Sequence, residues 1–169
     1  MNIAVIFAGG TGTRMNSKDK PKQFLKMHDK PIIIHTLEKF ENNENIDAIV
    51  IACIKDWIDY LSHLIEYYHM SKVKKIVPGG ETGQMSIYAG LNVAKDIADG
   101  QNAIVLIHDG VRPLINDDVI NNNITSVMKN GSAITSIKVT ETIMEINDDA
   151  SIKHCLLYTS DAADEEDSV

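Results

Sequence analysis

The chain has 169 residues, of which 44% are hydrophobic, and a formal net charge of −8 at pH 7. This is enough for one domain with a core, and the lack of a run of about 18 apolar residues predicts no membrane span. The sequence enters an apolar strand directly rather than a signal peptide, and the negative charge argues against non-specific nucleic-acid binding. Cys53 and Cys155 form neither a CxxC nor a Cys/His metal spacing. We therefore expect a cytoplasmic protein that binds neither nucleic acid nor a membrane.

The first predicted element is a short buried strand at Ile3–Phe7, which ends in the glycine-rich run Ala8–Met15. Glycines in such a loop let backbone N–H groups approach an anion closely. The run is not a P-loop, because Arg14-Met15 stands where a P-loop has Gly-Lys-Ser/Thr, and the dinucleotide-binding pattern would need a glycine at Met15. By itself the loop fits an ordinary strand-to-helix turn as well as a phosphate site.

Two cations accompany this loop, Arg14 at its far end and Lys22 in the segment Pro21–Phe24, with a polar stretch between them. Two cations near a triphosphate suit phosphoryl or nucleotidyl transfer, in which the protein mainly positions groups and neutralises charge on phosphate oxygens. The alternative for both is a solvated surface charge.

The rest of the chain alternates between strands and helices. Strands are predicted at Ile46–Cys53, Lys75–Val77, Ala103–Ile107, Ala133–Val139 and Thr142–Ile146. Helices are predicted at Pro31–Phe40, at Trp57–Tyr68, from after Gly80 to about Ala98, and from a cap at Asn116 or Asp117 to a stop at Gly131. The apolar face that includes Trp57 is typical of a core helix, so we expect no ligand there. An α/β sheet of this order binds its ligand at the carboxyl ends of its strands, where Gly79-Gly80 and His108-Asp109 should also lie.

Several separated motifs together resemble the CTP-dependent polyol-phosphate cytidylyltransferases. They are Ala8–Met15, Pro21–Phe24, Gly79-Gly80 with Ser86 and Gly90-Leu91, His108–Pro113, and Glu141-Thr142. This family includes the 2-C-methyl-D-erythritol 4-phosphate enzyme of isoprenoid biosynthesis and the ribitol-5-phosphate enzyme of wall-polymer (teichoic acid) biosynthesis. Residues 30–40, Asp56-Trp57 and Val111 look more like the ribitol branch. The resemblance implies a Rossmann-like nucleotidyltransferase fold, with a mostly parallel sheet and helices on both faces. It also implies Mg²⁺-dependent transfer of the cytidylyl group of CTP to a polyol phosphate.

The resemblance also implies a role for each matching residue. Arg14 and Lys22 are the expected catalytic residues, which stabilise charge at the α-phosphate. Arg112 is expected to meet the phosphate of the polyol substrate, and Thr142 to contact that substrate. Asp109 is expected to meet the substrate or the metal ion. The expected nucleotide-binding residues are Ala8, Gly9, Gly10, Thr11, Gly12, Gly80, Glu81 and Ser86. Gly83 stands where members of the family usually carry arginine, and His108 is expected to be structural.

The resemblance ends at about His154. We expect residues 1–154 to form a cytidylyltransferase domain that lacks later elements of the family. Residues 155–169 are expected to be a non-native disordered tail, since Cys155–Glu165 resembles a translated sequencing adapter and the last residues are acidic without a cation. In a full-length form we expect a homodimer joined by an arm that begins near Glu141. The shorter chain should be unstable and inactive, even if it binds CTP weakly.

Two other functions stay open from the sequence. A sugar-1-phosphate nucleotidyltransferase shares the Ala-Gly-Gly loop but lacks the other motifs. An inactive nucleotide-binding fragment of a cytidylyltransferase would account for the elements that have no counterpart here.

Overall fold

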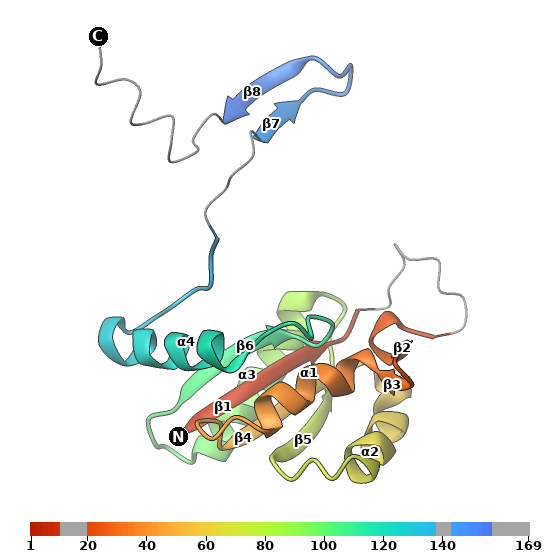
Figure 1. Ribbon diagram of the computed structural model, residues 1–169, viewed down its shortest axis with the longest axis vertical. Coiled ribbons are helices and arrows are strands. Elements are labelled where there is room, and N and C mark those ends of the chain that lie inside the picture. The colour runs from red at the N-terminus through yellow and green to blue at the C-terminus, as the bar shows by residue number, and fades with distance from the viewer. Residues whose placement is uncertain (11–19, 138–142, 157–169) are drawn as a thin grey trace. The chain divides into compact units, whose positions relative to one another are not determined.

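The computed structural model describes residues 1–10, 20–137 and 143–156. They belong to two compact units, Met1–Ala133 and Ile134–Val169 (Figure 1). Four predicted site residues, Thr11, Gly12, Arg14 and Thr142, lie outside the described residues, as does the predicted tail beyond Leu156.

The first unit is built on a four-stranded, fully parallel sheet with the strand order β5-β4-β1-β6. Its strands are β1 (Asn2–Ala8), β4 (Ala48–Cys53), β5 (Val73–Pro78) and β6 (Ile104–Asp109). All six residues of β4 are buried. Parallel strands covered on both faces read as continuous apolar runs, which is why the sequence of this strand does not alternate.

Helices cover both faces of this sheet (Figure 1). On one face, α1 (Ile32–Glu41), α2 (Ile58–Tyr67) and α4 (Asp117–Asn130) pack against one set of β1 and β4 side chains. On the other face, α3 (Gly83–Ala98) packs against the alternate set, which includes Ile3 and Val5. The predicted α/β fold with a parallel sheet between helices is therefore confirmed.

Local sequence signals explain where the later helices begin and end. The Thr82 side chain accepts a hydrogen bond from the Met85 N–H at the start of α3, and Asn116 does the same for Val119 at the start of α4. The last helix stops at Gly131, whose φ of 82° lies in the left-handed region. The predicted cap at Asn116 and stop at Gly131 are confirmed.

Short elements connect β1 to α1. A 3₁₀ helix, η2 (Lys22–Phe24), is followed by the two-residue strands β2 (Lys26–Met27) and β3 (Lys30–Pro31), which pair antiparallel. A second 3₁₀ turn, η3 (Lys55–Trp57), leads into α2. Sequence periodicity did not predict these elements, because they are too short to show it.

In the second unit, β7 (Ile143–Ile146) pairs antiparallel with β8 (Ile152–Leu156). The prediction of a strand at Thr142–Ile146 is thus confirmed for its described residues, and β8 was not predicted. The strand predicted at Ala133–Val139 is wrong over 133–137, where no strand is present and Ile134 and Ile137 are 88% and 91% exposed. Alternating apolar residues give a segment only a tendency to form a strand. The strand forms where a neighbouring strand can pair with the segment. The remaining two residues of that prediction lie outside the described range.

Candidate active site

Loops from three strands meet at the carboxyl edge of the sheet, as the topology predicts. A Cβ atom built on Gly9, just after β1, would lie 2.6 Å from the Ser86 hydroxyl, and one on Gly79, just after β5, would lie 2.8 Å from the same oxygen. A Cβ on Gly110, after β6, would lie 3.1 Å from Cβ of Ala8. The glycines at these positions therefore allow the loops to approach one another more closely than larger residues would.

Ser86 holds the loop between β5 and α3. It is 2% exposed, and its hydroxyl accepts a hydrogen bond from the Gly80 N–H at 3.1 Å and donates to the Thr82 carbonyl at 3.1 Å. The Gly79 N–H in turn donates to the Cys53 carbonyl at 2.7 Å, which ties this loop to the end of β4. Ser86 thus shapes the backbone of the predicted nucleotide loop, while Glu81 in the same loop is exposed.

Lys22 lies on η2, which is bound to the end of β1 through its neighbour Gln23. The Gln23 side chain is 1% exposed, and its amide donates to the Ala8 carbonyl at 2.7 Å and to the Gly10 carbonyl at 3.3 Å. These bonds bring the predicted catalytic lysine segment to the predicted nucleotide loop. Sequence reasoning assigned Gln23 no role.

An aromatic cluster supports the other side of η2. The Phe24 ring is 1% exposed and stacks on Trp57, with ring centroids 4.8 Å apart. Tyr60 packs edge-on against both rings, and the Lys20 ammonium lies 5.5 Å from the centre of the Tyr60 ring. Trp57 is therefore part of the packing around η2, as its place on an apolar helix face predicted.

The end of β6 carries Asp109 beside the start of the glycine loop, since Asp109 is in register with Phe7 of β1. The Asp109 carboxylate accepts a hydrogen bond from the Val111 N–H at 3.1 Å and pairs with the Arg112 guanidinium at 3.4 Å. The Arg112 side chain is 76% exposed, against 25% for Asp109. Arg112 can therefore swing toward solvent or toward an anion at little cost.

His108 is a packing residue in this structure. Its ring lies 5.2 Å from the Phe40 ring, between centroids, and its Nε2 is 3.1 Å from the Arg112 carbonyl. Burial lowers the pKa of His108 below its ordinary value, an effect that outweighs the hydrogen bond to Arg112. A lowered pKa favours the neutral ring, which agrees with the structural role expected from the sequence.

A second residue that sequence reasoning missed lies behind Asp109. Thr36 on α1 is fully buried, and its hydroxyl donates to the Gly110 carbonyl at 3.0 Å, which anchors the loop after β6 to the helix that follows β3. Its only signal in the sequence is a polar residue on the apolar face of a helix.

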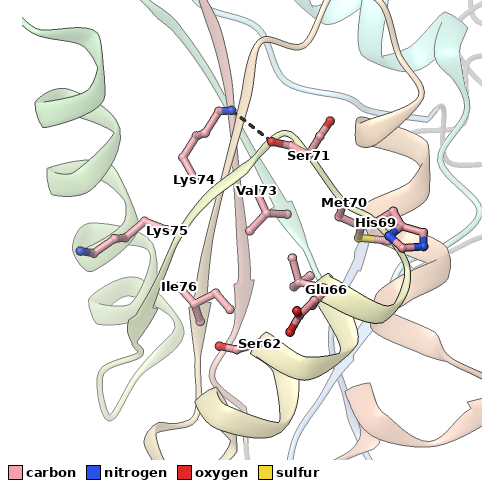
Figure 2. Close-up of a pocket in the computed structure, with 10 residues that line it drawn as sticks. Ser62, Glu66, His69, Met70, Ser71, Val73, Lys74, Lys75 and Ile76 are labelled. Atoms are coloured by element: carbon pink, nitrogen blue, oxygen red, sulfur yellow. Dashed lines mark hydrogen bonds between the residues drawn. The ribbon is translucent and has the colours of Figure 1, made fainter.

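The structure also has an open pocket of about 500 Å³ between α2 and the outer strand β5. Figure 2 shows it, with the Lys74 ammonium donating to the Ser71 carbonyl at 3.1 Å; Glu66 belongs to α2 and His69 to the turn that follows this helix. None of the predicted site residues lines this pocket. It is therefore separate from the predicted site.

Two negative findings concern the described residues only. They contain no group of three or more His, Cys, Asp or Glu side chains that could hold a metal ion. None of their helices is long and apolar enough to cross a membrane.

Comparison with known proteins gives a consistent result. A sequence profile of the family described as IspD, 2-C-methyl-D-erythritol 4-phosphate cytidylyltransferase, matches residues 2–161. The ribitol-5-phosphate cytidylyltransferase of Streptococcus agalactiae serotype Ia is 58% identical over 152 residues, covering 90% of this chain and 63% of that protein. The 2-C-methyl-D-erythritol 4-phosphate cytidylyltransferase of Clostridium novyi is 42% identical over 156 residues, covering 92% and 65%.

A solved structure supports the fold assignment. The 4-diphosphocytidyl-2C-methyl-D-erythritol synthase of Anaerococcus prevotii matches with a TM-score of 0.73 and 28% sequence identity, over 90% of this chain and 62% of that one. The chain thus spans less than two thirds of the length of these relatives. Since the family profile extends over nearly the whole of the chain and the fold agrees with it, the chain belongs to the IspD family of cytidylyltransferases.

Proposed function

We propose that the protein transfers the cytidylyl group of CTP to a polyol phosphate, with ribitol 5-phosphate as the first candidate, and releases pyrophosphate. The observation that carries this proposal is the convergence of Ala8–Gly10, the Gly79-Gly80 loop and the Lys22 segment at one edge of the sheet. Fold alone would not support a particular chemistry. What supports nucleotidyl transfer is that the small residues Gly9 and Gly79 leave room for a nucleotide near the segment that carries Lys22.

In this proposal the nucleotide lies across the ends of β1 and β5. Ala8, Gly9 and Gly10 supply backbone groups on one side, and Gly80 and Ser86 shape the other. Thr11, Gly12 and Glu81 complete the predicted set. Backbone donors and acceptors can read the edge of a pyrimidine base, and glycines allow it to come close.

The chemical step forms one P–O bond and breaks another. An oxygen of the polyol phosphate attacks the α-phosphorus of CTP, and the bond to the leaving pyrophosphate breaks. Lys22, together with Arg14, neutralises the charge that grows on the phosphate oxygens. The polyol phosphate needs no separate base, because its dianion is already nucleophilic.

Asp109 suits a magnesium ion in this reaction. Mg²⁺ commonly binds through one or two carboxylates together with substrate phosphates. Asp109 offers one partly exposed carboxylate at the sheet edge. Bound there, the ion would neutralise negative charge on the triphosphate. Arg112, which now pairs with Asp109, is proposed to turn to the phosphate of the polyol substrate, and Thr142 to contact the same substrate.

The relatives support the proposed choice of polyol phosphate. The ribitol-5-phosphate cytidylyltransferase of S. agalactiae shares 58% of aligned residues, whereas the C. novyi 2-C-methyl-D-erythritol 4-phosphate enzyme shares 42%. We therefore favour ribitol 5-phosphate and keep 2-C-methyl-D-erythritol 4-phosphate as the alternative. We further infer a cytoplasmic reaction, where CTP is available, and a homodimer as the assembled state.

The test is a pyrophosphate-release assay with each nucleoside triphosphate and each of the two polyol phosphates. It is run on the 169-residue chain and on a form extended to the length of its relatives, here called the extended form. We expect release by the extended form with CTP and ribitol 5-phosphate. A preference for UTP would contradict the proposal and favour a sugar nucleotidyltransferase, and a preference for the erythritol substrate would favour the alternative.

A further inference from the structure

Gln23 is a buried polar side chain between the two segments of the proposed site. Its amide donates to the carbonyls of Ala8 and Gly10, the residues on either side of Gly9, at 2.7 and 3.3 Å. With only 1% of its surface exposed, Gln23 is shielded from the bulk solvent that could otherwise replace these bonds. The next residue back along η2 is Lys22.

We propose that Gln23 is a positioning residue, which fixes the Lys22 segment against the glycine loop and sets the direction of the loop's backbone groups. The proposal rests on the function proposed above. A trans peptide is planar, so its N–H points away from its carbonyl. By holding the Ala8 carbonyl, Gln23 turns the Gly9 N–H to the opposite side of that peptide, where an anion can meet it.

Gln23 positions the Lys22 segment through its hydrogen bonds and not only through its packing. Phe24 already packs η2 against Trp57 and Tyr60, so the turn has an apolar anchor of its own. What the aromatic anchor cannot do is hold two carbonyl oxygens at a fixed distance from Lys22. Gln23 does so with both amide hydrogens of one side chain.

The proposal predicts a distinctive response to a change of one atom. In Gln23→Glu, a protonated carboxyl still donates one hydrogen bond, whereas an ionised carboxylate only accepts and would face two carbonyl oxygens. Burial favours the protonated form, so the change should occur within an accessible pH range. The variant should therefore resemble the wild type in acid and lose the arrangement as pH rises.

The experiment uses the 169-residue chain with variants Gln23→Glu and Gln23→Met. Gln101→Glu, at an exposed position after α3, is the matched control for the added charge. Two quantities are measured from about pH 5 to about pH 8: the Kd of Mg²⁺–CTP relative to wild type at each pH, and the emission of Trp57. Trp57 is the only tryptophan of the chain and stacks on Phe24, so it reports on η2.

We expect the Kd of Gln23→Glu to approach the wild-type value at the acid end and to be about tenfold or more weaker at the alkaline end, with a Trp57 shift over the same range. Gln23→Met, which cannot donate at any pH, should bind weakly throughout, and Gln101→Glu should follow the wild type. The chemical denaturation midpoint of each variant, measured at both ends of the range, separates this effect from unfolding.

Three results would overturn the proposal. The first is Gln23→Glu binding CTP like the wild type at the alkaline end although a shift in Trp57 emission or in the denaturation midpoint shows that its carboxyl has ionised. The second is a Trp57 shift without any change in Kd, which would make Gln23 a purely structural residue. The third is wild-type affinity in Gln23→Met. Absence of CTP binding by both the wild-type chain and the extended form would instead contradict the proposed function, so the two failures are distinguishable.

Discussion

Lys22 is the predicted catalytic residue whose surroundings the structure describes. It is partly buried on η2, next to a glutamine bound to the glycine loop. Because charge grows on the α-phosphate only as the transition state forms, Lys22→Met in the extended form should lower kcat by about 10²–10³ with a much smaller change in nucleotide Kd. Lys26→Met, at an exposed position four residues later, is the control. Near-wild-type kcat in Lys22→Met, measured by pyrophosphate release, would remove this lysine from the mechanism.

Arg14 should behave in the same way, because the family resemblance gives it the same task. Arg14→Ala in the extended form is expected to lower kcat far more than it weakens nucleotide binding. Equal losses in kcat and affinity would mean that Arg14 binds ground state and transition state alike. Single-turnover rates beside equilibrium titration separate these outcomes.

Cys53 illustrates what complete burial does to a reactive group. It is fully buried at the end of β4, and burial raises the pKa of its thiol from 9.0 to about 11. The thiolate is the reactive form, so native Cys53 should resist iodoacetamide at neutral pH, whereas the denatured chain should react. Mass spectrometry of the peptide that contains Cys53 measures this. Labelling of the native protein as fast as that of the denatured chain would contradict the burial.

The raised pKa of Cys53 also makes the free energy of unfolding depend on pH, because the folded and unfolded chains bind different numbers of protons. Between pH 9.0 and about 11 the unfolded chain releases the Cys53 proton while the folded chain keeps it. The unfolded state then binds fewer protons, so the free energy of unfolding falls as pH rises through this range. In Cys53→Ala, the free energy of unfolding should therefore fall less over the same pH range than in the wild type.

Helix α3 approaches the sheet through a glycine. A Cβ on Gly90 would lie 2.5 Å from a methyl group of Val5, a fully buried residue of β1, whereas one on Gly83 at the start of the helix would meet nothing within 4 Å. Gly90→Ala should therefore lower the free energy of unfolding by about 1–3 kcal/mol. Gly83→Ala should leave it unchanged or raise it by about 0.5–1 kcal/mol, since alanine favours a helix. Urea denaturation of both variants gives the comparison.

A double variant tests why Gly90→Ala should destabilise the protein. If the clash with Val5 is responsible, Val5→Ala should cost less in the Gly90→Ala background than in the wild type, because the two side chains occupy the same space. Strictly additive losses would mean that Gly90→Ala destabilises the helix by another route.

Elements whose signals are local could be predicted from the sequence. The cap at Asn116 and the stop at Gly131 rely on chemistry within a few residues, and β4 on an unbroken apolar run. Strand β7 was predicted, whereas its partner β8 was not, although a turn signal lies between them. The Asn147 N–H donates to the Ser151 carbonyl, and Ser151 donates to the Asp149 side chain. An Asn-Asp-Asp sequence is a recognised turn signal.

In the candidate site too, some features could be predicted from the sequence and others could not. The meeting of the loops after β1, β5 and β6 was predicted from the alternation of strands and helices, because parallel strands end at one edge of their sheet. Gln23 and Thr36 could not be assigned, since their partners are backbone carbonyls brought close only by the folded chain. Each is visible in the sequence merely as a polar residue beside apolar ones.

The assembled protein should be a dimer. The family resemblance places an exchanged arm after Glu141, and we expect the extended form to sediment as a homodimer at micromolar concentration. A monomer under those conditions would show that this property of the family does not carry over to the chain. Catalysis by such a monomer would further show that the site is complete within one copy.

The first strand of the chain occupies an inner place in its sheet, between β4 and β6. Ile3 pairs with Ala48 on one side and with Val105 on the other, so one edge of β1 stays open until β6 has been synthesised. At about 5–20 residues per second on the ribosome, that interval lasts for seconds, during which an unpaired apolar edge is exposed to other chains. We therefore expect the nascent protein to be most prone to wrong strand pairing, and most in need of chaperones, between the synthesis of Cys53 and that of Asp109.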